Sequence, residues 1–262
     1  MAETDLFKHS TPSLYDRCMG PLLFEPYARH VAERLALFRP KRILETAAGT
    51  GIVTRAVTEA VPEATIVATD VNPAVVEFAA QHVRSERVTF QRADAQDLPF
   101  EDATFDLVLC VFGVMFFPDK IRANAEARRV LGPGGRYLLV TFDRLDLNPV
   151  PKAAGDAVAS LFPEDPQYME RGPFSYTNPA GIENDLRAAG FTEIKIETVE
   201  LSSVVSARDA AHGIVLGSPF RAEIEQLDGS ALERAAAAVE EALRAWDGTD
   251  APVSAHVVTA AR

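Results

Sequence analysis

"ILETAAGTGIVTRAVTEAVPEATIVATD", residues 43–70, holds the pattern that decides the fold. A short apolar run begins it and another ends it, and a glycine-containing turn follows the first. Between the two runs, apolar residues recur at helical spacing from Ile52 to Ala60, and Pro62 ends that pattern. Short apolar strands joined by a helix are typical of parallel strands buried in one sheet. The stretch therefore predicts a β-α-β unit.

The same alternation continues along the chain. Further strands are expected at 87–94, 105–111, 136–142, 191–201 and 255–261, with helices at 73–83, 119–131 and 181–190. Strands that alternate with helices favour an α/β fold, here a doubly wound, mostly parallel sheet of seven strands. The last two strands are expected to pair in the antiparallel direction.

Three segments lie outside this alternation. We expect a helical cap at 1–40, an insertion rich in proline and aromatic residues at 144–178, and a helical lid at 203–250. The core is then 41–201 with its insertion, and 253–262 supplies the last strand. Each segment is either a packing element or a roof over the carboxyl ends of the strands, where ligands of open α/β sheets bind. The two interpretations are compatible.

The composition restricts the classes of function. A chain of 262 residues with 47% hydrophobic residues is expected to form one packed domain with small appendages. Its net charge of −12 repels polyphosphate on average, so we expect no nucleic-acid partner. The sequence leaves a monomer and a homodimer as the alternatives for its oligomeric state.

Cysteine usage and apolar runs indicate a cytoplasmic protein. Cys18 and Cys110 have no metal-ligand spacing, so no metal is expected. The longest apolar run, 107–117, is shorter than the roughly 20 residues that a membrane span needs. The first residues lack the order of charges and apolar residues that marks a signal peptide.

Residues that suit a nucleotide-like ligand follow three successive strands. Gly49 and Gly51 allow a sharp turn, and the next helix directs free N–H groups toward a ligand there. Asp70 ends the second strand, where a carboxylate accepts hydrogen bonds from ribose hydroxyls. Asp94 ends the third strand, where it would meet an adenine edge. Taken singly, each acid is equally a helix cap or turn residue. Their recurrence at strand ends favours a ligand site.

In this order, the motifs resemble those of the class I S-adenosylmethionine-dependent methyltransferases. They are "ILETAAGTG" (43–51), "ATDVNPAVVEFA" (68–79), "RADAQDLPFEDATFDLVLC" (92–110) and "RRVLGPGGRYLLV" (128–140). The resemblance covers roughly residues 10–200. In addition, "LYDRCMGPLLFEPYA" (14–28) and "VFGVMFFPD" (111–119) look like bacterial small-molecule methyltransferases related to the ubiquinone and menaquinone methylating enzymes.

The resemblance implies a Rossmann-like methyltransferase fold, S-adenosyl-L-methionine as cofactor and S-adenosyl-L-homocysteine as product. Glu45 would then support the loop or bond the methionine amino group, Asp70 would hold the ribose hydroxyls, and Asp94 would meet the adenine edge. Phe112 would face the sulfonium, and Tyr15 would close over the cofactor. The full set implied at the cofactor is Tyr15, Met19, Glu45, Thr46, Ala47, Ala48, Gly49, Thr50, Gly51, Asp70, Val71, Asn72, Asp94, Ala95, Gln96, Val111 and Phe112.

One position departs from the family pattern. The first motif usually carries glycine where this chain has Ala47. Alanine fits without strain if the residue keeps a negative φ, which is the expectation here. The departure then affects cofactor affinity more than the fold.

Methyl transfer from a sulfonium is an in-line displacement, so the protein chiefly holds the nucleophile near the methyl group in a dry pocket. A base is needed only when the nucleophile arrives protonated. His212, His9 and Tyr15 are the candidates for that role. An apolar acceptor pocket is expected from Met115, Phe116, Phe174, Tyr176 and Phe220, each of which is equally a core residue.

Two alternatives remain open from the sequence. A non-catalytic S-adenosylmethionine-binding protein would show the same cofactor motifs. An NAD(P)-dependent oxidoreductase also begins with a glycine turn and a distant acid, but its fingerprint has a third glycine where this chain has Thr54. The methyl acceptor and the acceptor atom are left undetermined.

Overall fold

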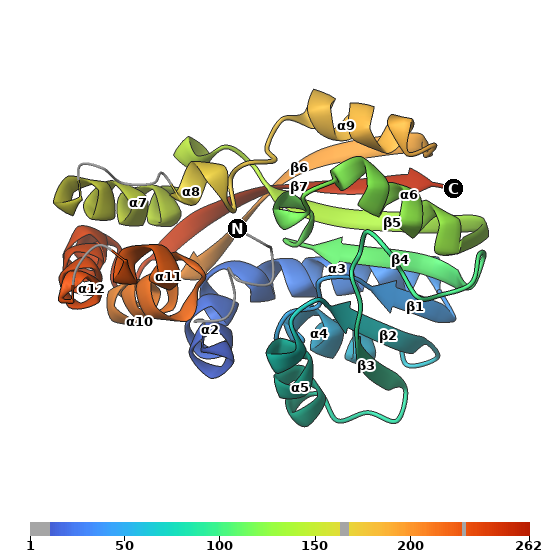
Figure 1. The fold of residues 1–262 in the computed structure, drawn as a ribbon, viewed down its shortest axis with the longest axis horizontal. Helices are drawn as coiled ribbons and strands as arrows, with labels where there is room; N and C mark the ends of the chain where they lie inside the picture. The colour runs from blue at the N-terminus through green and yellow to red at the C-terminus, as the bar shows by residue number, and fades with distance from the viewer. Residues whose placement is uncertain (1–10, 163–167, 227–228) are drawn as a thin grey trace.

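A computed structural model describes residues 11–162, 168–226 and 229–262 (Figure 1). Its centre is a seven-stranded sheet in the order β3-β2-β1-β4-β5-β7-β6. Neighbouring strands pair in parallel from β3 to β5, and β7 is antiparallel to both β5 and β6. The strands are β1 (Arg42–Glu45), β2 (Thr65–Asp70), β3 (Val88–Arg92), β4 (Phe105–Val111), β5 (Leu131–Phe142), β6 (Thr192–Val204) and β7 (Asp250–Ala261). The doubly wound, mostly parallel sheet predicted from the sequence is confirmed.

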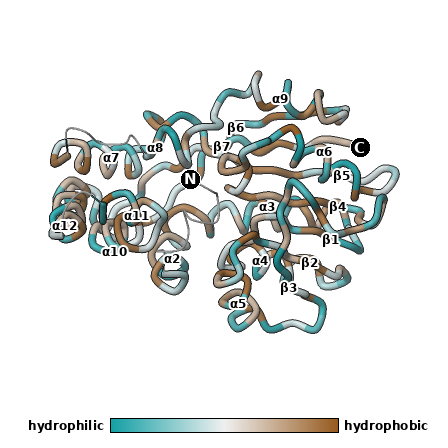
Figure 2. Tube along the Cα trace, in the orientation of Figure 1, coloured by the Kyte–Doolittle hydropathy of each residue, from teal (hydrophilic) through white to brown (hydrophobic). Residues whose placement is uncertain are grey.

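The central strands are buried on both faces, which explains their unbroken apolar sequences. In β4, Leu107, Val108 and Leu109 are at most 1% exposed. Figure 2 shows hydrophobic residues along the sheet and also within the helices at its far end. The apolar run at 107–117 is therefore one buried strand and the turn after it. No helix in the described ranges has the length and hydropathy needed to cross a membrane.

Helices cover both faces of the sheet. Helices α3 and α4 pack together on one face, and α6 and α9 pack together on the other (Figure 1). A separate group of helices lies at one end of the molecule, where α7 packs against α12 and α2 packs against the π-helical segment Gly213–Gly217. The helices are α2 (Pro12–Met19), α3 (Glu25–Phe38), α4 (Ile52–Ala60), α5 (Pro73–His82), α6 (Lys120–Val130), α7 (Pro149–Leu161), α8 (Tyr168–Arg171), α9 (Pro179–Ala188), α10 (Ala207–His212), α11 (Phe220–Glu225) and α12 (Ala231–Leu243), with short 3-10 or π segments at Gly20–Phe24, Val114–Phe116, Leu145–Leu147, Gly213–Gly217 and Arg244–Trp246.

Strands β6 and β7 continue beyond the rest of the sheet. The pairing of β5 with β7 ends at Phe142 and Ala255, whereas the pairing of β6 with β7 continues to Val204 and Asp250. This two-stranded arm extends past the carboxyl end of β5 and carries α10–α12 at its tip (Figure 1). Helices thus occupy most of the segment expected as a lid at 203–250. The strands on either side of it are longer than expected, since β6 continues to Val204 and β7 begins at Asp250.

The insertion at 144–178 also contains regular structure that its composition concealed. Helix α7 begins with Pro149, which fits a first helical turn because proline needs no N–H partner there. Val150, Ala154 and Val158 lie at helical spacing and are buried. The insertion therefore belongs to the helical group that faces the carboxyl ends of the strands.

Tyr27 fastens α3 to the base of the two-stranded arm. Its side chain is 0% exposed, and its hydroxyl lies 2.6 Å from the carbonyl oxygen of Val199 and 2.8 Å from that of Val253. We expect Tyr27→Phe to lower the free energy of unfolding by about 1–2 kcal/mol, because a buried hydrogen bond is lost. Urea unfolding measures this. Tyr15→Phe is the matched control, since the Tyr15 hydroxyl has no hydrogen-bond partner within the described ranges; an equal loss in both variants would contradict the assignment.

Candidate functional site

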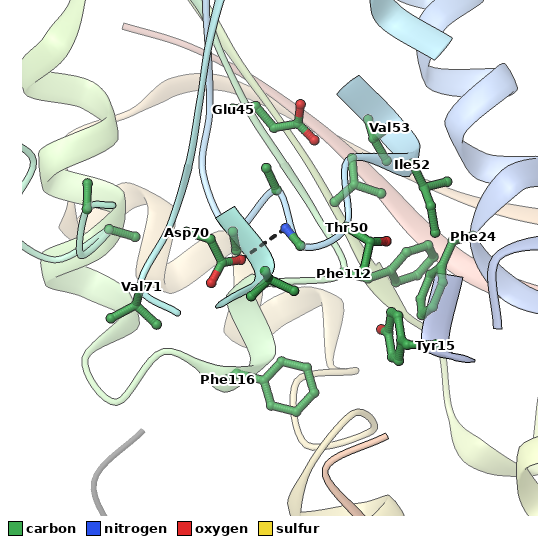
Figure 3. A pocket seen from close by; sticks show the side chains of 18 of the residues that line it. Tyr15, Phe24, Glu45, Thr50, Ile52, Val53, Asp70, Val71, Phe112 and Phe116 are labelled. Atoms are coloured by element: carbon green, nitrogen blue, oxygen red, sulfur yellow. Dashed lines mark hydrogen bonds between the residues drawn. The ribbon is translucent and has the colours of Figure 1, made fainter. Parts of the chain in front are cut away.

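A cavity opens where the carboxyl ends of β1, β2 and β4 meet the start of α4. It encloses about 1080 Å³ of empty space, its open mouth included. Strands β1 and β4 are neighbours inside the sheet, and the chain leads from β1 to β2 on one side and from β4 to β5 on the other. Open α/β sheets bind ligands at such a switch point. Figure 3 shows Asp70 across this first cavity from a group of rings formed by Tyr15, Phe24 and Phe112, with Thr50 beside the rings and Glu45 above.

The loop after β1 has a left-handed backbone at three residues. The φ angles are 52° at Ala47, 55° at Gly49 and 84° at Gly51. The expectation of a negative φ at Ala47 is therefore wrong. The loop keeps the conformation that suits glycine, and a residue with a Cβ there costs about 1–2 kcal/mol. The surrounding contacts hold it in place, with the Ala48 N–H donating to the carbonyl of Thr69 at 2.9 Å.

Gly113 provides the room that the Ala47 side chain requires. A Cβ placed on Gly113 would lie only 2.4 Å from the Cβ of Ala47. It would also lie 3.2 Å from the Cys110 Sγ. The loops after β1 and β4 thus touch through these two residues, so their side-chain sizes depend on each other.

Asp70 joins the loop after β1 to the start of α5. One carboxylate oxygen accepts from the Gly49 N–H at 3.0 Å, and the other accepts from the Asn72 N–H at 2.9 Å. Burial raises the pKa of Asp70, and these N–H groups act in the opposite direction. The helix cap is Asn72, whose side chain accepts from the Ala74 N–H. Asp70 is therefore a cavity-lining carboxylate and not the cap of α5.

Glu45 is a second carboxylate at the cavity and is only 2% exposed. The Thr54 hydroxyl donates to its Oε2 at 2.7 Å. Burial, together with the smaller effect of the negative charge of Asp70, raises the pKa of Glu45 to about 8, although the hydrogen bond from Thr54 acts in the opposite direction. Thr54 stands where the dinucleotide-binding fingerprint has its third glycine, and its hydroxyl holds the Glu45 carboxylate by this hydrogen bond.

The Thr50 hydroxyl and the Asp94 carboxylate are two further polar groups that line the first cavity. The Thr50 Oγ1 is buried at the cavity and has no hydrogen-bond partner within the described ranges. Asp94 is held by a turn, in which its Oδ1 accepts from the Gln96 N–H at 2.8 Å. The Gln96 side chain in turn accepts from the Asp119 N–H at 2.9 Å. Gln96 therefore positions the loops around the cavity while Asp94 and Ala95 line it.

Five aromatic rings in contact form an aromatic wall beside this cavity and a second one, and all of its neighbouring pairs are stacked except Phe24 and Phe112, which are tilted by 56°. The ring centroids lie 5.4 Å apart for Tyr15 and Phe24, 5.6 Å for Phe24 and Phe112, 4.2 Å for Phe112 and Phe142, and 4.8 Å for Phe142 and Phe174. Phe112 also has a positive φ of 55°. Backbone strain at a bulky residue persists only where the surroundings fix it, often at functional sites.

The second cavity lies on the helical side of this aromatic wall. It encloses about 560 Å³ of empty space, its mouth included, and shares Tyr15, Phe24, Phe112 and Phe116 with the first. Within the described part of the chain, no Asp, Glu, Lys, Arg or His lines it. The other lining residues are Met19, Leu23, Phe142, Pro151, Tyr168, Met169, Pro173, Phe174, Ile214, Ser218 and Pro219.

Most of the residues that the family resemblance places at the cofactor line the first cavity. Those that line it are Tyr15, Glu45, Ala47, Ala48, Gly49, Thr50, Asp70, Val71, Asp94, Ala95, Val111 and Phe112. Met19 lines the second cavity, and those that line neither are Thr46, Gly51, Asn72 and Gln96. Thr46 and Gly51 shape the loop from behind, because the Thr46 N–H donates to Leu109 and the Gly51 N–H to Ala48.

Only some of the residues expected in the acceptor pocket line a cavity. Phe116 lines both cavities and Phe174 lines the second, whereas Met115, Tyr176 and Phe220 line neither. Among the candidate bases, Tyr15 lines both cavities and His212 lines neither; His9 lies outside the described residues.

Sequence reasoning missed several lining residues. Phe24, Phe142, Tyr168 and Met169 lie in segments that meet only in three dimensions. Their apolar character alone did not separate them from core residues. The motif "LYDRCMGPLLFEPYA" contains Phe24, and the segment expected as a roof at 144–178 contains Tyr168 and Met169, but neither signal singled out these residues.

Comparison with known proteins finds methyltransferases, in agreement with the family that the sequence motifs resemble. The methyltransferase domain family matches residues 44–139. A demethylmenaquinone methyltransferase from Deinococcus radiodurans is 40% identical over 145 residues, covering 54% of this chain and 60% of that protein. The demethylmenaquinone methyltransferase of Clavibacter sepedonicus is 31% identical over 169 residues, covering 59% and 67%. The alignment to the Deinococcus protein thus covers about three fifths of that protein's length.

The solved structures agree in fold. The phosphoethanolamine N-methyltransferase 2 of Haemonchus contortus, in complex with S-adenosyl-L-methionine, has a TM-score of 0.63 at 18% identity. The match covers 100% of this chain and 60% of that one. At this level of identity, the similarity concerns the fold alone.

The contact between Ala47 and Gly113 predicts a strong coupling. We expect Gly113→Ala to lower the free energy of unfolding by about 1–3 kcal/mol through overpacking. Ala47→Gly should raise it by roughly 1 kcal/mol, because the left-handed backbone suits glycine. In the double variant most of the Gly113→Ala loss should disappear, since the opposing Cβ is gone.

Denaturant unfolding of the four proteins in this cycle measures the coupling. Ala47→Gly combined with Gly132→Ala is the control, because a Cβ on Gly132 has no contact closer than 3.6 Å and none with Ala47. Distant sites should be additive. Additivity in the Ala47–Gly113 cycle as well would show that the two loops do not touch in this way.

The raised pKa of Glu45 predicts a dependence of stability on pH. The unfolded chain ionises this carboxyl near its ordinary value of 4.5, whereas the folded chain keeps the proton to about pH 8. Stability of the ligand-free protein therefore falls across this range. Glu45→Gln has no carboxyl to ionise at this position, so its stability should not fall in this way. Relative to the parent, its free energy of unfolding should therefore rise by about 2–4 kcal/mol between pH 5 and 8.

Thermal and urea unfolding at several pH values test this expectation. Glu101→Gln, at an exposed position, reports the effect of removing a charge alone. A constant difference between parent and Glu45→Gln from pH 5 to 8 would show that Glu45 ionises normally in the folded chain.

Proposed function

The chain belongs to the class I S-adenosylmethionine-dependent methyltransferases, and on this premise we propose that it transfers a methyl group from S-adenosylmethionine to a small apolar or aromatic molecule. The observation that carries the proposal is the pair of adjoining cavities. The first is lined by the carboxylates of Glu45 and Asp70 and by the glycine-containing loop after β1, and the second is apolar. The aromatic wall that they share is the place where the two ligands would meet.

The residues of the first cavity fit the proposed cofactor. Asp70 presents a carboxylate that accepts hydrogen bonds, as ribose hydroxyls require. Glu45 provides a buried partner for an amino group, and an ammonium beside it would favour its ionised form. The unpartnered Thr50 Oγ1 is available to a carboxylate at the start of α4, where the helix N-terminus favours negative charge.

S-adenosylmethionine supplies, when bound, a methyl group on a positively charged sulfonium that is already a good leaving group. The chain has to orient the acceptor and exclude water. Phe112 and Tyr15 line both cavities, so their ring faces are placed to attract a nearby cation. The strained backbone of Phe112 is consistent with a ring held in one position.

The second cavity supports an acceptor that is neutral and largely apolar. Its described lining offers no charged side chain to pair with a charged group. The names of the relatives, demethylmenaquinone methyltransferases, point to a ring-containing acceptor of this kind. The lining also offers no histidine, lysine or carboxylate as a base, so the nucleophile would arrive without a proton to lose or release it to solvent.

Helices α10–α12 would act as the roof of this site. Ile214, Ser218 and Pro219, from the segment between β6 and β7, form part of the second cavity. Met19 and Tyr15 from α2 approach it from the other side, because Gly213 and Gly217 leave room for them. Water exclusion is thus assigned to the helical group.

Calorimetry tests the cofactor assignment. We expect S-adenosylhomocysteine to bind and NAD⁺ to give no heat. Asp70→Asn should weaken S-adenosylhomocysteine binding by about 1–3 kcal/mol, because an ionised acceptor is lost. Asp106→Asn is the matched control, since that carboxylate also accepts two backbone N–H groups but lies outside the cavity. Tight NAD⁺ binding without S-adenosylhomocysteine binding would overturn the proposed function.

A further inference from the structure

In its described lining, the second cavity has three hydroxyl groups, those of Ser218, Tyr15 and Tyr168, and one of them is already engaged. The Ser218 hydroxyl donates to the carbonyl of Ile214 and accepts from the Phe220 N–H at 3.2 Å. The phenol groups of Tyr15 and Tyr168 remain. Neither has a hydrogen-bond partner anywhere in the part of the chain that the structure describes.

Tyr168 is the more deeply buried of these two phenols. It is 6% exposed and lines only the second cavity, whereas Tyr15 is half-buried and lines both. Among the described residues, the Tyr168 hydroxyl oxygen is not one of the fully enclosed polar atoms that lack a partner, so it lies at the surface of the cavity, where water or a ligand can pair with it. Sites that recognise a polar atom of their substrate present a hydroxyl in this way.

The ring of Tyr168 is fixed by its neighbours. It stacks on Phe220 with centroids 4.7 Å apart and planes 10° apart, and Phe220 is 1% exposed. Gly172 leaves space for the ring, because a Cβ there would lie 3.3 Å from the Tyr168 Cε2. Arg171, in the same short helix, forms an ion pair with Glu223 of α11 at 2.9 Å. The hydroxyl therefore has a defined position before any ligand binds.

We propose that Tyr168 is a specificity-determining residue, whose hydroxyl donates a hydrogen bond to a polar atom of an uncharged, ring-containing acceptor. The aromatic wall of Phe112, Phe142 and Phe174 packs against the apolar body of that acceptor. This inference rests on the proposed function and adds to it the residue that orients the acceptor. The donor role is consistent with protonation, since burial raises the pKa of Tyr168 above its usual value.

Two matched probes test the role of the hydroxyl. 2-Naphthol carries a polar atom on a fused ring, and 2-methylnaphthalene replaces that atom with a methyl group. Both are titrated by fluorescence into the parent and into Tyr168→Phe, with S-adenosylhomocysteine present. The variant keeps the ring stacked on Phe220, so its fold and S-adenosylhomocysteine affinity should be unchanged. We expect it to bind 2-naphthol about tenfold more weakly and 2-methylnaphthalene within twofold of the parent.

Tyr137→Phe is the control, because Tyr137 is a buried phenol that lines neither cavity. It should bind both probes as the parent does. Equal 2-naphthol affinity in the parent and Tyr168→Phe overturns the proposal, as does failure of the parent to bind either probe. Tighter binding of 1-naphthylmethylammonium than of 2-naphthol overturns the assignment of an uncharged acceptor.

The two proposals fail in different ways. A protein that binds S-adenosylhomocysteine but loses no 2-naphthol affinity in Tyr168→Phe loses only the role of Tyr168. A protein that does not bind S-adenosylhomocysteine loses the proposed function, whatever the probes show.

Discussion

The carboxylate of Asp70 connects the parts on which the site depends. It accepts N–H groups from two separate loops, Gly49 after β1 and Asn72 before α5. Each loop begins at the end of a parallel strand, so the register of β1 with β2 fixes where the loops start. The carboxylate then determines how they approach each other. The first cavity is thus a consequence of sheet register and one shared acceptor.

Because the two loops are fixed, strain can be tolerated nearby. Ala47 and Phe112 both keep a left-handed backbone that disfavours residues with a Cβ. The Phe112 N–H donates to the carbonyl of Val140, so β5 holds the start of the turn after β4. Gly113 then fits against Ala47. The loops after β1 and β4 form one tightly packed unit, and a change in either is transmitted to the aromatic wall.

The sequence was sufficient for those parts of the structure that local patterns determine. Alternating strands and helices gave the sheet, and the spacing from Gly49 to Asp70 gave the first cavity. The φ of Ala47 was not predictable, because it depends on the fixed loop and on the absence of a side chain at Gly113. The negative φ expected from the residue type was therefore wrong.

The second cavity illustrates a different limit of sequence reasoning. Phe24, Phe142 and Tyr168 belong to segments far apart in the chain, and each has the apolar surroundings of a core residue. The length of β6 and β7 beyond β5 brings α10–α12 to the group of helices at the carboxyl ends of the strands. That length is set by long-range pairing and not by local composition, since the sequence placed the strand boundaries at 201 and 253.

The two cavities differ in polarity, and this difference has a physical consequence. Burial raises the pKa of Glu45 and of Asp70, so the empty first cavity disfavours two ionised carboxylates close together. A cation bound between them and the aromatic wall would favour their ionised forms and gain from the low dielectric of the surroundings. The described lining of the second cavity has no charged side chain and offers no competing ion pair. The chain therefore concentrates its electrostatic attraction for a cation in the first cavity, and leaves the second to recognise its ligand by shape, apolar contact and the phenol of Tyr168.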